Sequence, residues 1–481
     1  MLTKELGGSG RENQEVYHSR GERKSVSLIN ALRDEQESAA SVHARACANE
    51  ETGDQNEMID RRSGNRLREF TEYCLIIAMY YVTGGAFSYS YYSAQITVFF
   101  LAGGWIALVY GAFRRLLGKK AFAALLSMSC LILLVPVLNN DGFSSYIAIV
   151  MQLFIGFMIA GVIRPDEFCR KYVAVMVFFA AVSLLGFAAG AVYPSIATFF
   201  PRIIGDASVD YYNAGVYVFM QPKGYASFRL MTRNAGICWE PGCYQCFVNI
   251  ALLFLLEEKR KGTARRFTLK FAILVTTVFT TFSTTGMIIL CLLLAVYVKT
   301  WRGKSRVASV MVPVLGAALA LYVLAATTPG QRIVQKIASE ILNHGSEGQN
   351  LFTRTSLGHI RYLFEDGFWF FGMSFPRLLS FGAKGLWNSV IHSILCLGIP
   401  FTLIQMTGYW KGSRALSSRG GLLFVIMLMC ASTETLFWRV FFNAIAAYGW
   451  MYAPCRQRGK SALMIPGVDG NAAYGMREDT R

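Results

Sequence analysis

The stretch RNAGICWEPGCYQCF, residues 233 to 247, places an arginine and a glutamate just before a strongly apolar run. A guanidinium group makes bidentate, charge-assisted hydrogen bonds to phosphate, and a carboxylate can take a proton from a hydroxyl group. Arg233 is therefore a candidate phosphate ligand and Glu240 a candidate general base. A structural alternative is that Pro241 and Gly242 start a helix, whose free N–H groups and dipole accommodate Glu240, with Arg233 as its ion-pair partner.

A second candidate segment is NLFTRTSLGHIRYLFEDGFWFFGMSFP. A helix over residues 352–366 would place four residues on one face, because positions three and four apart are neighbours on a helix: Arg354, Gly358, Arg361 and Glu365. Two guanidinium groups beside a small residue would clamp a diphosphate. The alternative is an ordinary ion pair between Arg361 and Glu365.

Two histidines and one more arginine complete the candidate residues. His359 lies on another face of the same predicted helix, and His392 lies about one turn inside a later apolar run. An ionisable side chain at membrane depth is functional by default, although a structural histidine bonded to a carbonyl is the alternative. Arg229 shares its connection with Arg233 and is a further candidate diphosphate ligand; for each arginine the alternative is a solvated basic loop.

The composition indicates a membrane protein. Of 481 residues, 54% are hydrophobic and 16% charged, whereas soluble chains carry about a quarter charged residues. The apolar residues form blocks of about 16 to 25, long enough to cross roughly 30 Å of hydrocarbon as helices. The net charge of +17 comes from short basic clusters between these blocks, a pattern that fits the positive-inside rule and anionic lipids better than nucleic acid.

The expected fold class is all-α, a polytopic membrane bundle of about twelve transmembrane helices with two large outer loops, 198–240 and 327–387. Basic connections follow every even-numbered span, so both termini are expected in the cytoplasm. The predicted spans lie near residues 72–91, 94–113, 121–138, 144–163, 172–197, 241–256, 267–283, 286–300, 307–326, 388–408, 420–436 and 438–454.

The expected domain organisation has three parts. Residues 1–70 are polar, charged and poor in aromatics, and are predicted to be a disordered cytoplasmic tail. Residues 71–455 form the transmembrane catalytic bundle with its outer loops, and residues 456–481 form a cytoplasmic C-terminal tail.

No cofactor is expected from the sequence. The chain contains no G-x-x-x-x-G-K-[ST] nucleotide loop and no D-x-D pair in its predicted outer loops, so no metal dependence is expected. Cys238, Cys243 and Cys246 are closely spaced, but no second Cys or His cluster completes a set of four metal ligands.

Four segments in order resemble bacterial O-antigen polymerases of the Wzy type, within the wider group that includes O-antigen ligases. RNAGICWEPGCYQCFVNIALL looks like the family's Arg…Gly…Glu-Pro-Gly segment entering a helix, and FSTTGMIILCLLL like its Ser/Thr-Gly start of the following span. Arg361 and Gly372 are spaced like the R-x10-G element of the second large loop. NSVIHSILCLGIPFTLI looks like the Asn/His-bearing span that comes next, although His392 stands four residues after Asn388 rather than in a His-Asn pair. The resemblance covers roughly residues 72 to 454.

The resemblance implies a membrane glycosyltransferase of the bacterial inner membrane. It would move a glycan from undecaprenyl diphosphate to a lipid-linked repeat unit on the outer face, in the synthesis of O-antigen, capsule or exopolysaccharide. Arg233, Arg354 and Arg361 would hold the diphosphate, and Glu240, His359 or His392 would act as the base. The implied partners are lipid-linked oligosaccharides, a chain-length regulator and a flippase. An O-antigen ligase, or a flippase or transporter of lipid-linked oligosaccharides, remains the alternative.

Overall fold

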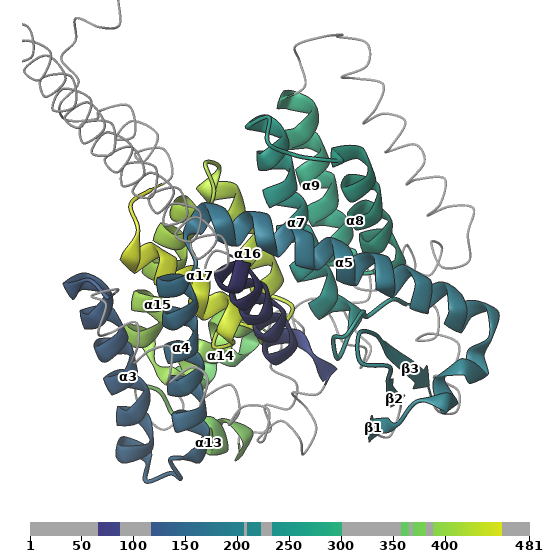
Figure 1. The fold of residues 1–481 in the computed structure, drawn as a ribbon. Helices are drawn as coiled ribbons and strands as arrows, with labels where there is room; N and C mark the ends of the chain where they lie inside the picture. The colour runs from purple at the N-terminus through teal and green to yellow at the C-terminus, as the bar shows by residue number, and fades with distance from the viewer. Residues whose placement is uncertain are drawn as a thin grey trace, which may run out of the picture. The chain divides into compact units, whose positions relative to one another are not determined.

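The computed structural model describes seven segments of the chain: residues 66–86, 117–205, 209–222, 233–300, 357–364, 369–380 and 388–454. Contacts divide the chain into two units, Met1–Thr71 and Glu72–Arg481. Of the first unit only residues 66–71 are described, as the beginning of a helix over 66–84. The second unit carries all other described elements (Figure 1). The predicted spans 94–113 and 307–326, the tail 456–481 and most of the tail 1–70 lie outside the described residues.

The protein is mostly helical, and the apolar runs of the sequence form its helices. Each boundary is set by a local signal, such as Pro165 and Pro241 in the first turns of their helices or the left-handed Asn140 after α3. The helices are α3 Lys119–Asn139, α4 Ser144–Val162, α5 Pro165–Val192, α7 Pro241–Arg260, α8 Phe267–Thr281, α9 Thr284–Thr300, α13 Phe375–Ser380, α14 Ser389–Leu397, α15 Ile399–Leu416, α16 Gly420–Ala431 and α17 Val440–Met451, with the 3-10 helices η2 Pro194–Phe199 and η4 Leu357–Leu363.

Within the described residues, α3, α4 and α5 are long and apolar enough to cross a membrane. Their outward faces carry exposed apolar side chains that water would not favour, including Phe122, Val137, Ile147, Phe178 and Leu185. Such faces indicate a membrane protein, because lipid tails solvate apolar side chains. Of the roughly twelve predicted spans, three therefore correspond to described helices whose length and composition would allow them to cross a membrane.

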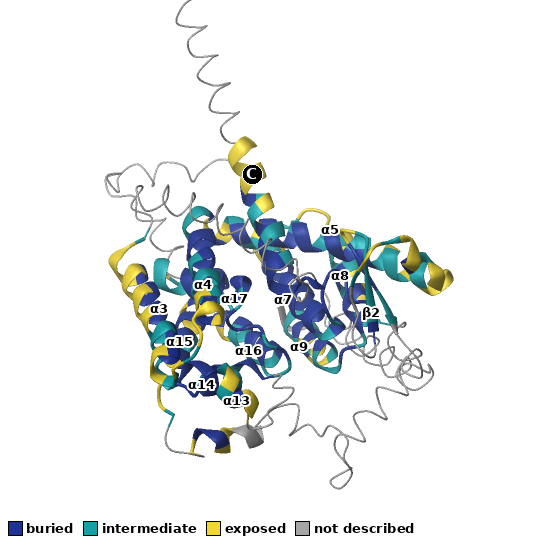
Figure 2. Ribbon diagram, turned by 90° about the horizontal axis from the view of Figure 1, so that it is seen from below, coloured by how far each residue is buried: buried dark blue, intermediate teal, exposed yellow. Residues whose placement is uncertain are grey.

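Helix α7 is the centre of the bundle and is buried along nearly its whole length (Figure 2). It is surrounded by α5, α8, α9 and α16, and every residue from Cys243 to Glu257 is buried. A helix buried on all sides needs no amphipathic pattern, and its polar side chains must find partners inside the protein. Asn249 does so, since its Nδ2 donates to Oε1 of Gln245 (2.9 Å) and to the carbonyl of Gly286 (3.2 Å).

Glycines allow α15 and α17 to approach backbone to backbone. A Cβ atom on Gly449 would lie within van der Waals overlap of Gly408 and Gly412 on α15, and a Cβ on Gly412 would overlap the carbonyl of Ile445. Small residues at four-residue spacing are typical of helix contacts in membranes, where close backbone contact replaces the hydrophobic effect as the driving force. Gly156 likewise allows α4 to pack closely against α17, because a Cβ atom there would overlap Asn443.

The connection after α5 contains a three-stranded antiparallel sheet, β1 Arg202–Gly205, β2 Val209–Asn213 and β3 Val218–Pro222, in the order β1-β2-β3. The all-α prediction missed this sheet because its strands are only four or five residues long. The sheet supports the start of α7 through two hydrogen bonds. The Tyr211 hydroxyl donates to the carbonyl of Trp239 (3.0 Å), and the amide of Val218 donates to the carbonyl of Gly236 (2.8 Å).

Two helical predictions differ from the structure. The predicted span 388–408 is two helices, α14 and α15, because Gly398 adopts a positive φ of 88° between them that other residues rarely adopt. The predicted helix over 352–366 is a 3-10 helix over Leu357–Leu363 in the part that is described. A 3-10 helix has three residues per turn, so Gly358 and Arg361 still share a side, whereas Arg354 and Glu365 lie outside the described residues.

The connections gather at two opposite ends of the bundle. At the C-terminal end of α7, Lys261 pairs with Asp166 (Nζ–Oδ1 3.3 Å), and Glu257 accepts hydrogen bonds from Ser417 and Arg419. These residues belong to three of the connections that the sequence assigns to the basic, cytoplasmic side. At the N-terminal end of α7 lie the residues that the sequence assigns to the other side, joined by contacts such as Asn139 Nδ2 to the carbonyl of Gly372 (3.1 Å).

A buried ion pair joins the helix over 66–84 to α5. Lys171 and Glu72 are 2% and 1% exposed and are bonded to one another, with the Tyr73 ring 5.5 Å from the ammonium group. Glu72→Leu leaves the Lys171 charge buried without its carboxylate, and we expect a loss of about 3–5 kcal/mol in the free energy of unfolding. SDS titration in mixed micelles would measure it. Glu72→Leu/Lys171→Met removes both charges and should regain most of the loss; a double variant as unstable as the single one would show that the charge is not the cause.

Candidate functional site

Glu240 is the N-cap residue of α7, but its side chain does not cap the helix. The backbone is extended there (φ −153°, ψ 157°), and none of the described first-turn amides donates to its carboxylate. The predicted N-cap position of Glu240 is confirmed, but its carboxylate makes no capping hydrogen bond within the described residues. Because Pro241 supplies the fixed φ of the first turn, the helix begins without that cap, and the Glu240 carboxylate is left for another role.

Arg233 is held by the end of α8. Its Nε donates to the carbonyl of Thr281 at 3.0 Å. The next residue, Asn234, is fully buried and anchors the segment, since its amide donates to the carbonyl of Thr280 (2.8 Å) and its Nδ2 to the Ser183 hydroxyl (3.0 Å). A half-buried guanidinium that is itself hydrogen-bonded and is followed by an anchored residue loses little further freedom on binding an anion.

The structure brings a second carboxylate to Glu240. Glu434 is 2% exposed and lies in the turn after α16. Its Oε1 occupies the space that a Cβ atom on Gly242 would take, and Oε1 of Glu240 lies 3.0 Å from the same point. Two carboxylates of residues far apart in the chain therefore converge at the first turn of α7.

An aromatic and a basic side chain extend this cluster. The Arg439 guanidinium lies over the ring of Trp239, 5.7 Å from its centroid, a cation–π arrangement. The neighbouring Trp438 contacts His392 edge to face, with ring centroids 4.8 Å apart. The turn between α16 and α17 thus links the α7 side of the site to α14.

His392 lies on α14 one turn after Asn388, whose side chain caps this helix by accepting from the amides of Val390 (2.9 Å) and Ile391 (3.2 Å). The His392 ring sits between Trp438 and Phe375 (ring centroids 5.5 Å apart). Its Nδ1 is shielded from solvent and has no hydrogen-bond partner among the described residues. The alternative of a structural histidine bonded to a carbonyl is thus not seen at Nδ1.

Arg361 lies on η4, which contacts α14. Its guanidinium is exposed and lies over the Tyr362 ring at 5.2 Å. The structure therefore brings Arg233 and Glu240 to the start of α7 and leaves Arg361 on an exposed neighbouring segment. Arg229 and Arg354 lie outside the described residues, as does the side chain of His359.

The other members of the site leave only a weak signal in the sequence. Glu434 and Arg439 both stand in the short polar break between two apolar runs, and a charge at such a break has many explanations. The cysteines near the start of α7 are buried free thiols. Across the described segments, no three His, Cys, Asp or Glu side chains come close enough to hold a metal ion.

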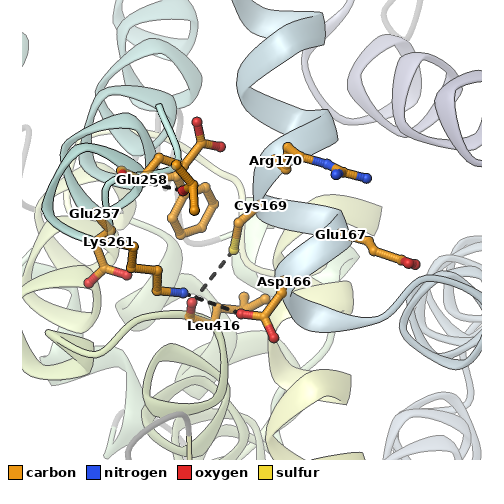
Figure 3. Close-up of a pocket in the computed structure, with 10 residues that line it drawn as sticks. Asp166, Glu167, Cys169, Arg170, Glu257, Glu258, Lys261 and Leu416 are labelled. Carbon is orange, nitrogen blue, oxygen red and sulfur yellow. Dashed lines mark hydrogen bonds and ion pairs between the residues drawn. The ribbon is translucent and has the colours of Figure 1, made fainter. Parts of the chain in front are cut away.

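A cavity of about 360 Å³ lies at the other end of α7 (Figure 3). Six of its ten lining residues are charged. Several of its polar groups are already paired: Asp166 with Lys261, the Cys169 thiol with the carbonyl of Leu416 (3.5 Å), and Glu257 with the 417–419 segment. None of the candidate residues of the sequence lines this cavity. It is therefore a rival location for ligand binding, against which the site at the start of α7 must be tested.

Glu258, which lines the cavity, makes a pH-dependent contribution to stability. Burial raises the pKa of its carboxyl group above the usual 4.5, partly offset by Lys270, Arg170 and Lys261. Below that ordinary value the group is protonated in both states; as the pH rises, the unfolded chain ionises first and stability falls. We expect Glu258→Gln to melt at a higher temperature than the wild type at pH 8 and at the same temperature at pH 4. Glu167→Gln controls for net charge, and an equal gain from it would contradict the assignment to burial.

Comparison with known proteins finds no match to this chain, whether among protein-family models, curated proteins or solved structures.

Proposed function

We propose that this protein is a membrane glycosyltransferase that polymerises lipid-linked glycans. It transfers a growing glycan from undecaprenyl diphosphate to a lipid-linked repeat unit at the outer face of a bacterial inner membrane. The observation that carries the proposal is the meeting of the Glu240 and Glu434 carboxylates at the first turn of the buried helix α7, with Arg439 over the adjacent Trp239 and Arg233 held at the end of α8. The first turn of α7 is at the end opposite the basic connections.

The charge distribution supports the orientation of this site. The connections at the C-terminal end of α7 carry clusters such as KRKGTARR (259–266), and short connections rich in lysine and arginine stay in the cytoplasm. The start of α7 then faces the outer side. Lipid-linked repeat units are polymerised on that side in the family that the sequence resembles.

The chemistry requires a diphosphate to leave an anomeric carbon. The acceptor hydroxyl oxygen forms the new bond to that carbon while the bond to the diphosphate oxygen breaks, and negative charge develops on the leaving oxygen. A fixed guanidinium meets this charge without reorganisation, and Arg233 is the best-held candidate because Thr281 and the Asn234 anchor fix it.

The acceptor hydroxyl must lose its proton in the same reaction. Glu240 is the proposed base, because its carboxylate is at the site and is not used to cap α7. His392 is the second candidate, since its Nδ1 has no partner among the described residues. Holding two lipid-anchored substrates in one place supplies much of the remaining acceleration through proximity.

Reconstitution of the purified protein in liposomes tests the proposal. The substrate is the lipid-linked repeat unit extracted from a producing strain that lacks this protein. We expect a ladder of longer lipid-linked glycans, with one undecaprenyl diphosphate released for each new bond. Transfer only to added lipid A core would identify a ligase, and movement of the substrate across the bilayer without lengthening would identify a transporter; either result would overturn the proposal.

A further inference from the structure

The turn between α16 and α17 is fixed on two sides. Ser389 of α14 bonds to it twice, because its hydroxyl donates to the carbonyl of Glu434 and accepts from the amide of Leu436 (2.7 Å). On the other side, Arg439 lies over Trp239, the residue before Glu240. The backbone of Glu434 is therefore positioned by the Ser389 side chain of α14.

Gly242 leaves space for the Glu434 carboxylate beside the first turn of α7. Any Cβ atom there would overlap Oε1 of Glu434, so the carboxylate occupies its place only because residue 242 has no side chain. Burying a carboxylate to 2% exposure costs free energy. The missing side chain at residue 242 thus allows this buried carboxylate to lie beside that of Glu240.

We propose that Glu434 is the second carboxylate of the site and that, together with Glu240, it binds hydroxyl groups of the acceptor sugar. This inference rests on the proposed function. Carboxyl oxygens accept hydrogen bonds, so two of them side by side match adjacent hydroxyl donors of a sugar better than a phosphate, which offers only acceptors. The acceptor sugar then lies on the Glu240–Glu434 side, and the donor diphosphate lies toward Arg233.

His392 provides a second observation, at the other end of the same turn. His392 is on the α14 face that also carries Ser389, and its ring contacts Trp438 within the turn. Its shielded Nδ1 has no hydrogen-bond partner among the described residues. A buried polar atom without a partner is costly in a folded protein, and a hydroxyl group of a bound sugar would supply the missing hydrogen bond.

Steady-state kinetics of the reconstituted protein test this role. The acceptor probe is the lipid-linked repeat unit with its anomeric oxygen replaced by methylene, which can accept a glycan but cannot donate one. We expect Glu434→Gln to raise the half-saturating acceptor concentration about 10- to 100-fold, as for the loss of a hydrogen bond to a charged group. The half-saturating concentration of the natural lipid-linked donor should stay unchanged.

Gly242 provides a second, independent variant. Gly242→Ala displaces the Glu434 carboxylate and should raise the same acceptor concentration, whereas in a Glu434→Ala background it should add little. Gly421→Ala, at a position with nothing within 4 Å, is the matched control and should behave as the wild type. If Glu434→Gln does not insert into the membrane, Glu434→Asp replaces it. This variant keeps the carboxyl group but shortens the side chain, and should also raise the half-saturating acceptor concentration.

The outcomes separate the two claims. A wild type that never lengthens glycans refutes the proposed function, and this inference falls with it. A wild type that lengthens glycans, with Glu434→Gln unchanged toward the acceptor, refutes only the role of Glu434. Equal losses toward donor and acceptor, or additive effects of Gly242→Ala and Glu434→Ala, would assign Glu434 a purely structural role and also overturn the inference.

Discussion

Glu240→Ala is expected to abolish long-chain product while the protein still inserts and stays folded. General-base assistance is worth about 10²–10⁴ in rate, and no capping hydrogen bond among the described residues is lost with this side chain. The stability of α7 should therefore change little. Chain-length analysis of glycan from cells carrying the variant, together with the rate of the reconstituted reaction, measures the effect.

The control for Glu240→Ala is Glu167→Ala, which removes a carboxylate at the opposite end of the bundle. It should leave chain length unchanged. Glu240→Gln separates the base from the shape of the side chain and should be nearly as inactive as alanine. Normal chain lengths from Glu240→Gln would move the role of base to His392.

Arg233→Ala is expected to lower the rate of transfer by about 10²–10³, the usual cost of removing one fixed donor to a developing anion. Arg233→Lys should recover only a small part, because an ammonium group cannot reproduce the bidentate fork. The Arg233 Nε also donates to the carbonyl of Thr281 and so fixes the side chain. A lysine has no donor at the corresponding position of its side chain. Single-turnover rates of the reconstituted protein measure the chemical step apart from product release.

Arg202 is the matched control for Arg233. It lies on β1 of the same connection, is 52% exposed and pairs with Asp210 at 2.6 Å. Arg202→Ala removes an equal charge from the same region and should leave the transfer rate within about twofold of the wild type, because an exposed ion pair contributes little. An equal loss from both variants would show that net charge, rather than the held guanidinium, attracts the lipid diphosphate.

The long helices could be predicted because each apolar run ends at a polar or Pro/Gly signal. Residues 121–138 were predicted and α3 covers Lys119–Asn139, and the prediction for α4 differs by one residue at its end. The sheet β1–β3 could not be predicted, because short strands inside a connection show too few alternations to set a period. The break at Gly398 was also missed, although Gly398 followed by Pro400 in the first turn of α15 is a signal for the end of one helix and the start of the next.

The site was predictable only where its residues are neighbours in the sequence. Arg233 and Glu240 stand within one short motif, and the Pro-Gly turn after them indicated the start of α7. Glu434 reaches Gly242 through tertiary contacts made by Ser389 and the α16–α17 turn. Such contacts leave no periodicity in a single sequence. The 3-10 helix around Arg361 was missed for a different reason: over so short a segment, the same apolar spacing fits either a 3-10 helix or an α-helix.

Photo-crosslinking asks whether the start of α7 holds the lipid diphosphate. The probe is undecaprenyl diphosphate carrying a diazirine beside the phosphates, irradiated with the protein in liposomes and mapped by peptide mass spectrometry. We expect label in residues 233–242 and 432–439. Unlabelled undecaprenyl diphosphate should remove this label, and Arg233→Ala should reduce it. Label confined to the cavity lined by Asp166, Glu258 and Lys261 at the other end of α7 would contradict this expectation.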